Sequence, residues 1–146
     1  MEQHTISHLI AGLALATTFG GMTFFSAVMA PLVFTNLPLD VAGGFIRQVF
    51  PWYYLSMGLT ILIALIALIL GAGGSAMWEV ILATAVLAGF AFAQEVLMPL
   101  INRARDREIA GEFGAARRFR RLHLVSVIIN GFQWLAVLAV LIRVLV

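Results

Sequence analysis

Four long apolar runs, separated by short breaks, dominate the chain. They cover approximately residues 6–34, 51–70, 76–100 and 122–146. Each run reaches or exceeds the roughly 20 residues that an α-helix needs to cross the hydrocarbon core of a bilayer. Because no water is available there, every backbone N–H and C=O must find a partner within its own segment, which favours helices. The pattern therefore predicts an all-α fold, an integral membrane four-helix bundle that forms a single domain over residues 1–146.

Prolines and glycines mark the breaks between these runs. Pro31 predicts a kink or an end near the close of the first helix, because proline lacks the N–H that the helix ladder uses. Pro51 suits the first position of the second helix, where that N–H has no partner to lose. The stretch "GAGGS", residues 71–75, predicts a turn before the third helix.

The composition supports a membrane environment for the whole chain. Hydrophobic residues make up 62% and charged residues 11%, and the mean hydropathy is +1.04. A soluble domain has about a quarter charged residues, because charges cover its surface. The N-terminal run lacks the basic segment of a secretory signal and is predicted to be a retained helix. With no cysteine, disulfides, thiolate metal sites and cysteine nucleophiles are excluded.

Arginine placement predicts the orientation. The segment 102–121 holds seven of the arginines against three acidic residues. Arg47 lies on the same side of the predicted bundle, whereas Arg143 is the one basic residue on the other side. Because basic loops stay in the cytoplasm, we expect the Arg-rich loop inside and both termini on the non-cytoplasmic side. The use of arginine alone is typical of a GC-rich bacterial genome, so we expect the bacterial inner membrane.

The Arg-rich loop is also a candidate contact with lipid. Basic residues near anionic headgroups are attracted by about 1 kcal/mol each, so a helical loop that lies on the membrane is one interpretation. A topology determinant without a specific ligand is the simpler one. Few aromatic residues accompany the arginines, and the loop lies against the membrane, so no nucleic-acid partner is predicted.

The fourth run carries a polar stripe. Its members are His123, Ser126, Asn130, Gln133 and Trp134. At 100° per residue they share about a third of the helix circumference. Polar groups in a membrane helix face other helices, where they find partners, so we expect the stripe to face the bundle.

Three residues of other runs are predicted to meet this stripe in an intramembrane polar cluster. Glu95 lies about 12 Å inside Arg103 at 1.5 Å per residue, and Tyr53 and Tyr54 fall at a similar depth. For Glu95 three roles stay open: carrying a proton, binding a cation together with His123, or a neutral, hydrogen-bonded state. The structural alternative is a network that fixes helix register, strengthened by an ion pair if Arg47 lies near.

Small residues recur at every fourth position of two runs. They are Gly12, Ala16 and Gly20 in the first run, and Ala85, Gly89 and Ala93 in the third. Such stripes let helix backbones approach closely in lipid. We expect close packing within the bundle, and a homo-oligomer or a larger membrane complex as partner.

The histidines give only weak signals for a bound metal or haem. His4 and His8 lie one turn apart, but no third ligand accompanies them. His8 and His123 are predicted at opposite faces of a hydrocarbon core about 30 Å thick, which argues against a bis-histidine haem site. No catalytic residue, metal site or cofactor is therefore predicted.

Two segments resemble a known family. "FTNLPLDVAGGFIRQVFPWYYLSMG" (residues 34–58) and "FRRLHLVSVIINGFQ" (residues 119–133) are similar to the transmembrane protein 205-like family, also called domain of unknown function 4149. The resemblance implies a small multi-pass membrane protein, and a eukaryotic relative's association with resistance to platinum drugs hints at metal or cation handling. The residues that carry it are Pro38, Pro51, Tyr53, His123, Ser126 and Asn130. No family role is assigned to them.

Three functions remain open. The first is a non-enzymatic accessory or interaction subunit of a membrane complex, in which the polar face serves helix packing. The second is transport of, or resistance to, a metal ion or small cation through Glu95, His123 and Asn130. The third, a haem-dependent membrane enzyme, has the least support, because the sequence holds neither a nucleophile–base pair nor a metal motif.

Overall fold

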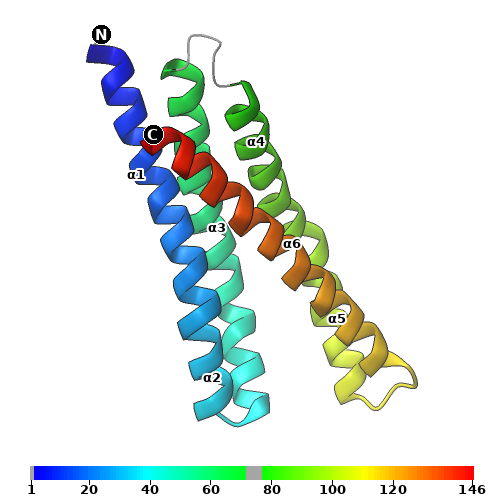
Figure 1. Cartoon of the computed structure of the whole chain (residues 1–146). Helices are drawn as coiled ribbons and strands as arrows, with labels where there is room; N and C mark the ends of the chain where they lie inside the picture. Colours follow the sequence, from blue (N-terminus) through cyan, green and yellow to red (C-terminus); the bar gives the residue numbers. More distant parts are fainter. Residues whose placement is uncertain (1, 72–76) are drawn as a thin grey trace.

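The computed structural model describes residues 2–71 and 77–146, with side chains from residue 5 onward, and these ranges are helical except for short turns (Figure 1). The elements, in chain order, are α1 (Glu2–Phe24), the π-helix η1 (Phe25–Met29), α2 (Ala30–Asn36), α3 (Leu39–Gly71), α4 (Met77–Phe92), the π-helix η2 (Ala93–Leu97), α5 (Met98–Ile109) and α6 (Ala115–Leu145). Four continuous helices are long and apolar enough to span a membrane. The predicted all-α, multi-pass membrane fold is confirmed. Most of the predicted "GAGGS" turn lies outside the described residues.

The second spanning helix begins much earlier than expected. α3 starts at Leu39, with Asp40 in its first turn, and Pro51 lies inside the helix. The prediction that Pro51 opens the helix was therefore wrong. Hydropathy detects the part of a helix that lies in hydrocarbon, whereas α3 continues beyond it. Its 33 residues span about 50 Å, against 40–45 Å for a bilayer with its headgroups.

Two other prolines are accommodated by π-helical turns. The N–H of Ala30 donates to the carbonyl oxygen of Phe25, five residues back, immediately before Pro31. The N–H of Met98 likewise donates to Ala93, immediately before Pro99. Because proline has no N–H to continue the ladder, one wider turn shifts the hydrogen-bond register ahead of it. The first helix thus continues past Pro31 to Asn36, instead of ending there.

The predicted Arg-rich loop 102–121 is mostly helical. α5 runs to Ile109 and α6 begins at Ala115, so only five residues connect them. Gly111 and Gly114 have φ angles of 76° and 79°, a conformation that side chains with a β-carbon adopt only with strain. The interpretation of this segment as helical is confirmed, and the arginines lie on two antiparallel helices that form the α5–α6 hairpin.

The bundle is closed at one end and divided at the other. α1 and α3 run side by side, and α6 crosses them on the side of the two termini (Figure 1). The turns of the α2–α3 hairpin and the α5–α6 hairpin lie at the opposite end and are separated there (Figure 1). Leu15, Met22, Ile61, Phe90 and Val137 form the buried centre. Each terminus thus lies at the end of the bundle away from the α5–α6 hairpin (Figure 1).

The two small-residue stripes are used unevenly. Gly12 packs against Val144 of α6, whereas Ala16 and Gly20 are exposed on the outside of α1. In the third spanning helix Ala93 is buried, Gly89 is half-buried and Ala85 is exposed. Only part of each stripe therefore supports packing within one chain.

Candidate functional site

Gln133 joins α6 to α4 in the centre of the bundle. Its side chain is 7% exposed, and its amide donates to the Val86 carbonyl oxygen at 3.0 Å. Gly89 makes room for it, because a β-carbon at that position would lie 2.7 Å from the Gln133 amide nitrogen. This member of the predicted stripe faces the bundle as expected and holds two helices together.

Trp134 joins α6 to α1. Its indole N–H donates to the Thr23 hydroxyl at 2.8 Å, and its ring lies 4.9 Å from that of Phe19. A hydrogen-bonded indole in an apolar bundle satisfies its single donor and adds ring contact. The stripe thus contacts two different helices through neighbouring residues.

Asn130 and Tyr53 approach each other between α6 and α3. The Asn130 amide is the polar group that faces the Tyr53 hydroxyl, but the two lack regular hydrogen-bond geometry, and the hydroxyl is buried without a partner among the described residues. Phe25 stacks on the Tyr53 ring at 4.4 Å, and Tyr54 lies edge-on to it at 5.3 Å. The structure therefore brings together three residues of the predicted cluster, Tyr53, Tyr54 and Asn130.

Ser126 and His123 lie farther toward the Arg-rich end of α6. The Ser126 hydroxyl donates to the His123 carbonyl oxygen of its own helix at 2.8 Å. The His123 side chain is exposed and stacks on Phe119 at 6.0 Å between ring centroids. Among the described residues, no hydrogen bond or ion pair connects either side chain to Glu95.

Glu95 occupies a different surface, the groove between α3 and α4. It belongs to the π-helix η2, is exposed, and accepts a hydrogen bond from the Gln94 amide at 3.2 Å. The groove has a volume of about 250 Å³. Its walls are mainly apolar side chains of α3 and α4, with Gln94 and Glu95 toward the Arg-rich end. A carboxylate therefore borders an otherwise apolar, open groove.

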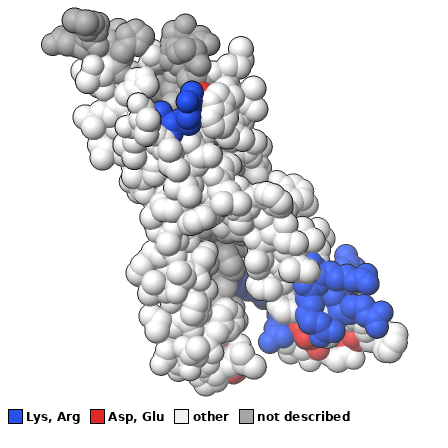
Figure 2. All heavy atoms as spheres, viewed as in Figure 1, with Lys and Arg blue, Asp and Glu red and all other residues white. Residues whose placement is uncertain are grey.

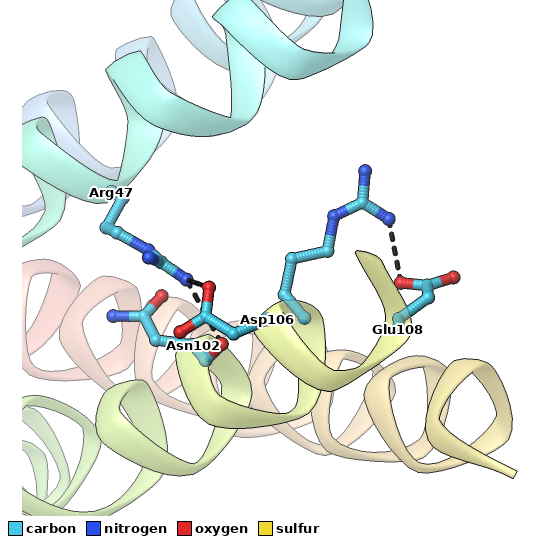
Figure 3. Close-up of polar contacts among 5 residues, drawn as sticks. Arg47, Asn102, Asp106 and Glu108 are labelled. Atoms are coloured by element: carbon cyan, nitrogen blue, oxygen red, sulfur yellow. Dashed lines mark hydrogen bonds and ion pairs between the residues drawn. The ribbon is translucent and has the colours of Figure 1, made fainter. Parts of the chain in front are cut away.

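Arg47 does not pair with Glu95. It reaches from α3 to α5, where its guanidinium donates to the Asp106 carboxylate at 2.7 Å and to the Asn102 carbonyl oxygen at 3.0 Å (Figure 3). The possible ion pair between Arg47 and Glu95 is not formed. Helix rise predicts the depth of a residue, but it does not predict which face or which neighbour the side chain meets.

The remaining described carboxylates are compensated. Glu79, Asp106, Glu108 and Glu112 each lie within 4.0 Å of an arginine nitrogen. Asp40 lies in the first turn of α3, where the helix dipole stabilises negative charge. Glu95 alone, among carboxylates with described side chains, has neither an arginine nor a helix N-terminus.

The ion pair near the termini was not predicted. Arg143 of α6 lies 3.5 Å from Glu79 of α4, which is 6% exposed, and 5.9 Å from the centroid of the Trp78 ring. The sequence contains the signal, because Glu79 lies at the start of the third spanning helix and Arg143 at the end of the fourth, so both charges fall at the same end of the bundle. It closes the bundle at this end.

The described residues offer no group of three histidine or acidic side chains that is close enough to hold a metal ion. The His4–His8 pair, for which no metal site was predicted, includes a side chain outside the described part. His8 lies near the start of α1 and His123 near the start of α6, at opposite ends of the bundle (Figure 1). This arrangement agrees with the argument against a shared haem.

A protein-family model described as "Domain of unknown function (DUF4149)" matches residues 13–110. The match covers the second half of α1 and continues to the end of α5, so it includes Tyr53, Tyr54 and Glu95 but not α6. No curated protein and no solved structure gives a significant match to the chain.

Proposed function

The chain belongs to the DUF4149 family, and we propose that it is a non-enzymatic membrane interaction subunit whose α3–α4 groove binds a transmembrane helix of another protein. The observation that supports this proposal is the unpaired Glu95 carboxylate beside an open apolar groove. The partner helix supplies a basic or hydrogen-bonding side chain to that carboxylate.

The energetics of an exposed acid favour such a partner. A charged side chain in a membrane helix costs about 2.5–3.5 kcal/mol at the bilayer centre and less toward the headgroups. Glu95 is about 24 Å along the helix from Glu79 at 1.5 Å per residue, which places it in the half of the bilayer nearer the arginines. A partner that neutralises the carboxylate removes the remaining cost.

The shape of the groove also suits a helix. Gly58 and Ala91 line it, and nothing lies within 4 Å of where a β-carbon on Gly58 would stand. Small residues allow a second helix backbone to approach closely, which is the main source of association in lipid. The groove therefore combines an anchor, Glu95, with space for close packing.

The test is co-purification after gentle detergent extraction, followed by native electrophoresis and mass spectrometry. We expect a co-migrating membrane protein with the wild type, and at least a ten-fold loss of it with Glu95→Gln or Gly58→Leu. Glu112→Gln is the matched control, because it removes one exposed acid away from the groove. A monodisperse, partner-free wild-type monomer contradicts the proposal.

The alternative function is transport of, or resistance to, a metal ion or small cation. Glu95 also favours this role, since its carboxylate has no cation of its own and the adjoining groove suits an organic cation with an apolar body. A single carboxylate is a poor metal site, so a metal ion would need ligands from a second subunit. Titration of the purified protein with tetraphenylphosphonium, compared with its Glu95→Gln variant, distinguishes this function from a protein partner.

Orientation and location are part of the proposal. We place the Arg-rich end in the cytoplasm and both termini outside, because arginine is concentrated at one end. The use of arginine without lysine, typical of a GC-rich bacterial genome, supports the inner membrane of a bacterium. Reporter fusions at each terminus and in the 110–114 turn test this directly. The closer likeness to transmembrane protein 205-like proteins also stays a prediction, since its second segment, 119–133, lies beyond the matched residues.

A further inference from the structure

The α5–α6 hairpin has two sets of arginines. Its three acidic residues are already paired: Asp106 with Arg47, Glu108 with Arg105 and Glu112 with Arg107. The other five arginines of the hairpin are exposed and have no ion pair among the described residues; they are Arg103, Arg117, Arg118, Arg120 and Arg121. Figure 2 shows most of the basic side chains gathered on this one lobe of the molecule. Internal pairing thus leaves the hairpin with a large positive surface.

The turn of the same hairpin exposes apolar side chains. Phe113 is fully exposed and Ile109 is 74% exposed. The turn is held in shape by Gly111 and Gly114, each with positive φ. An aromatic and an aliphatic side chain beside unpaired arginines form an amphipathic tip, which is typical of segments that lie in the interfacial region of a membrane.

We propose that this hairpin binds anionic phospholipid headgroups of the bilayer that the chain spans, with the unpaired arginines on phosphates and Phe113 in the interfacial layer beside them. A guanidinium forms paired, charge-assisted hydrogen bonds to phosphate oxygens. The headgroups are always within reach, because α6 continues directly from these arginines into its apolar segment. This inference does not depend on the groove at Glu95.

Other polyanions fit less well. An acidic protein or a nucleic acid would satisfy the arginines, but neither accounts for an exposed phenylalanine and isoleucine at the tip of a hairpin anchored by two spanning helices. A lipid bilayer supplies phosphates and apolar chains a few ångströms apart. It therefore matches both features with one partner.

The first test compares two variants with the same change of net charge. Arg117→Gln/Arg118→Gln removes two unpaired arginines, and Arg105→Gln/Arg107→Gln removes two paired ones. Native mass spectrometry measures the affinity of each variant for phosphatidylglycerol, with phosphatidylcholine as the reference lipid. We expect about a 25-fold loss for the first variant, about five-fold per arginine, and clearly less for the second. Equal losses overturn the proposal, because binding would then follow net charge alone.

The second test reports the position of the tip. Since the chain has no cysteine, Phe113→Cys provides a single site for a spin label. In bilayers that contain phosphatidylglycerol we expect the label to be protected from a water-soluble nickel reagent and accessible to oxygen, and less protected in pure phosphatidylcholine. Ala110→Cys, in the same turn, is the reference position. A label at position 113 that stays fully accessible to nickel in anionic bilayers overturns the proposal, and it then points to a soluble polyanion.

Discussion

The two hairpins at the divided end differ sharply in chemistry. The α2–α3 hairpin exposes Leu32, Phe34, Leu37 and Leu39, and Asp40 is the one charged residue between positions 30 and 46. The α5–α6 hairpin carries seven arginines and three acids over residues 98–121. Both turns lie at the same end of the bundle (Figure 1). A turn at this end therefore does not require charge, and the arginines are a property of one hairpin.

One side chain connects the two hairpins. Arg47, from the apolar hairpin, reaches Asp106 and the Asn102 carbonyl of the basic one (Figure 3). Because Arg47 neutralises Asp106, this acid does not pair with an arginine of the basic hairpin. One more arginine of that hairpin is therefore free to bind an external partner. Apolar side chains suit the boundary of the acyl chains, whereas arginines suit phosphates. The α2–α3 hairpin therefore suits the outer part of the hydrocarbon layer, and the α5–α6 hairpin suits the headgroup layer next to it.

The largest expected effect concerns backbone conformation, which includes positive φ angles in the turn of the α5–α6 hairpin and is regular in α3. Gly114→Ala should lower the free energy of unfolding by about 1–2 kcal/mol, because a residue with a β-carbon is strained at positive φ. Gly43→Ala should raise it by up to about 1 kcal/mol, since Gly43 lies inside α3 with open space around it. Unfolding in mixed detergent micelles measures both. Equal signs for the two substitutions would falsify the contrast between a strained turn and a regular helix.

A smaller effect is expected from adding a charge to the apolar hairpin. Leu39→Arg should cost about 1 kcal/mol or less in a bilayer, as for basic residues near a membrane interface, and almost nothing in detergent. Leu39→Ala is the control for the lost side chain. If Leu39→Arg is neutral or stabilising in bilayers of anionic lipid, the α2–α3 turn lies among headgroups and the contrast between the hairpins disappears.

The smallest change in stability is expected at the bridge. Arg47 and Asp106 have side chains 41% and 58% exposed, so Arg47→Gln should cost less than about 1 kcal/mol. In the Arg47→Gln variant, the distribution of distances between spin labels at Leu39→Cys and Phe113→Cys should nevertheless become broader. Arg107→Gln, which removes an ion pair within the basic hairpin, should leave that distance unchanged. An unaltered distribution in Arg47→Gln shows that other contacts hold the hairpins in place.

The fold was predictable to the level of four spanning helices. Their ends were not, because hydropathy reports where lipid chains surround a helix, and these helices continue past their most apolar segments. Pro51 illustrates the error: it suits a helix start, yet the amphipathic residues 39–50 extend the helix before it. The two π-helices gave no hydropathy signal, although each precedes a proline.

The candidate site was predicted in part. Tyr53, Tyr54 and Asn130 meet, as depth and helix face suggested. Gln133 binds a backbone carbonyl, a partner that no side-chain pattern indicates. Glu95 lines the α3–α4 groove and does not join these residues. The prediction failed here because the depth of an acid does not determine the helix face on which it lies.

Composition and order alone determined the environment, the number of spans and the concentration of arginine at one end. These properties depend on sums over many residues, so a few misplaced boundaries do not change them. The tertiary structure decided which charges are paired. Ion pairs form only over a few ångströms, and the crossing of α6 and the reach of Arg47 set those distances. For that reason the structure alone revealed that Glu95 and five arginines of the basic hairpin have no ion pair within the described chain.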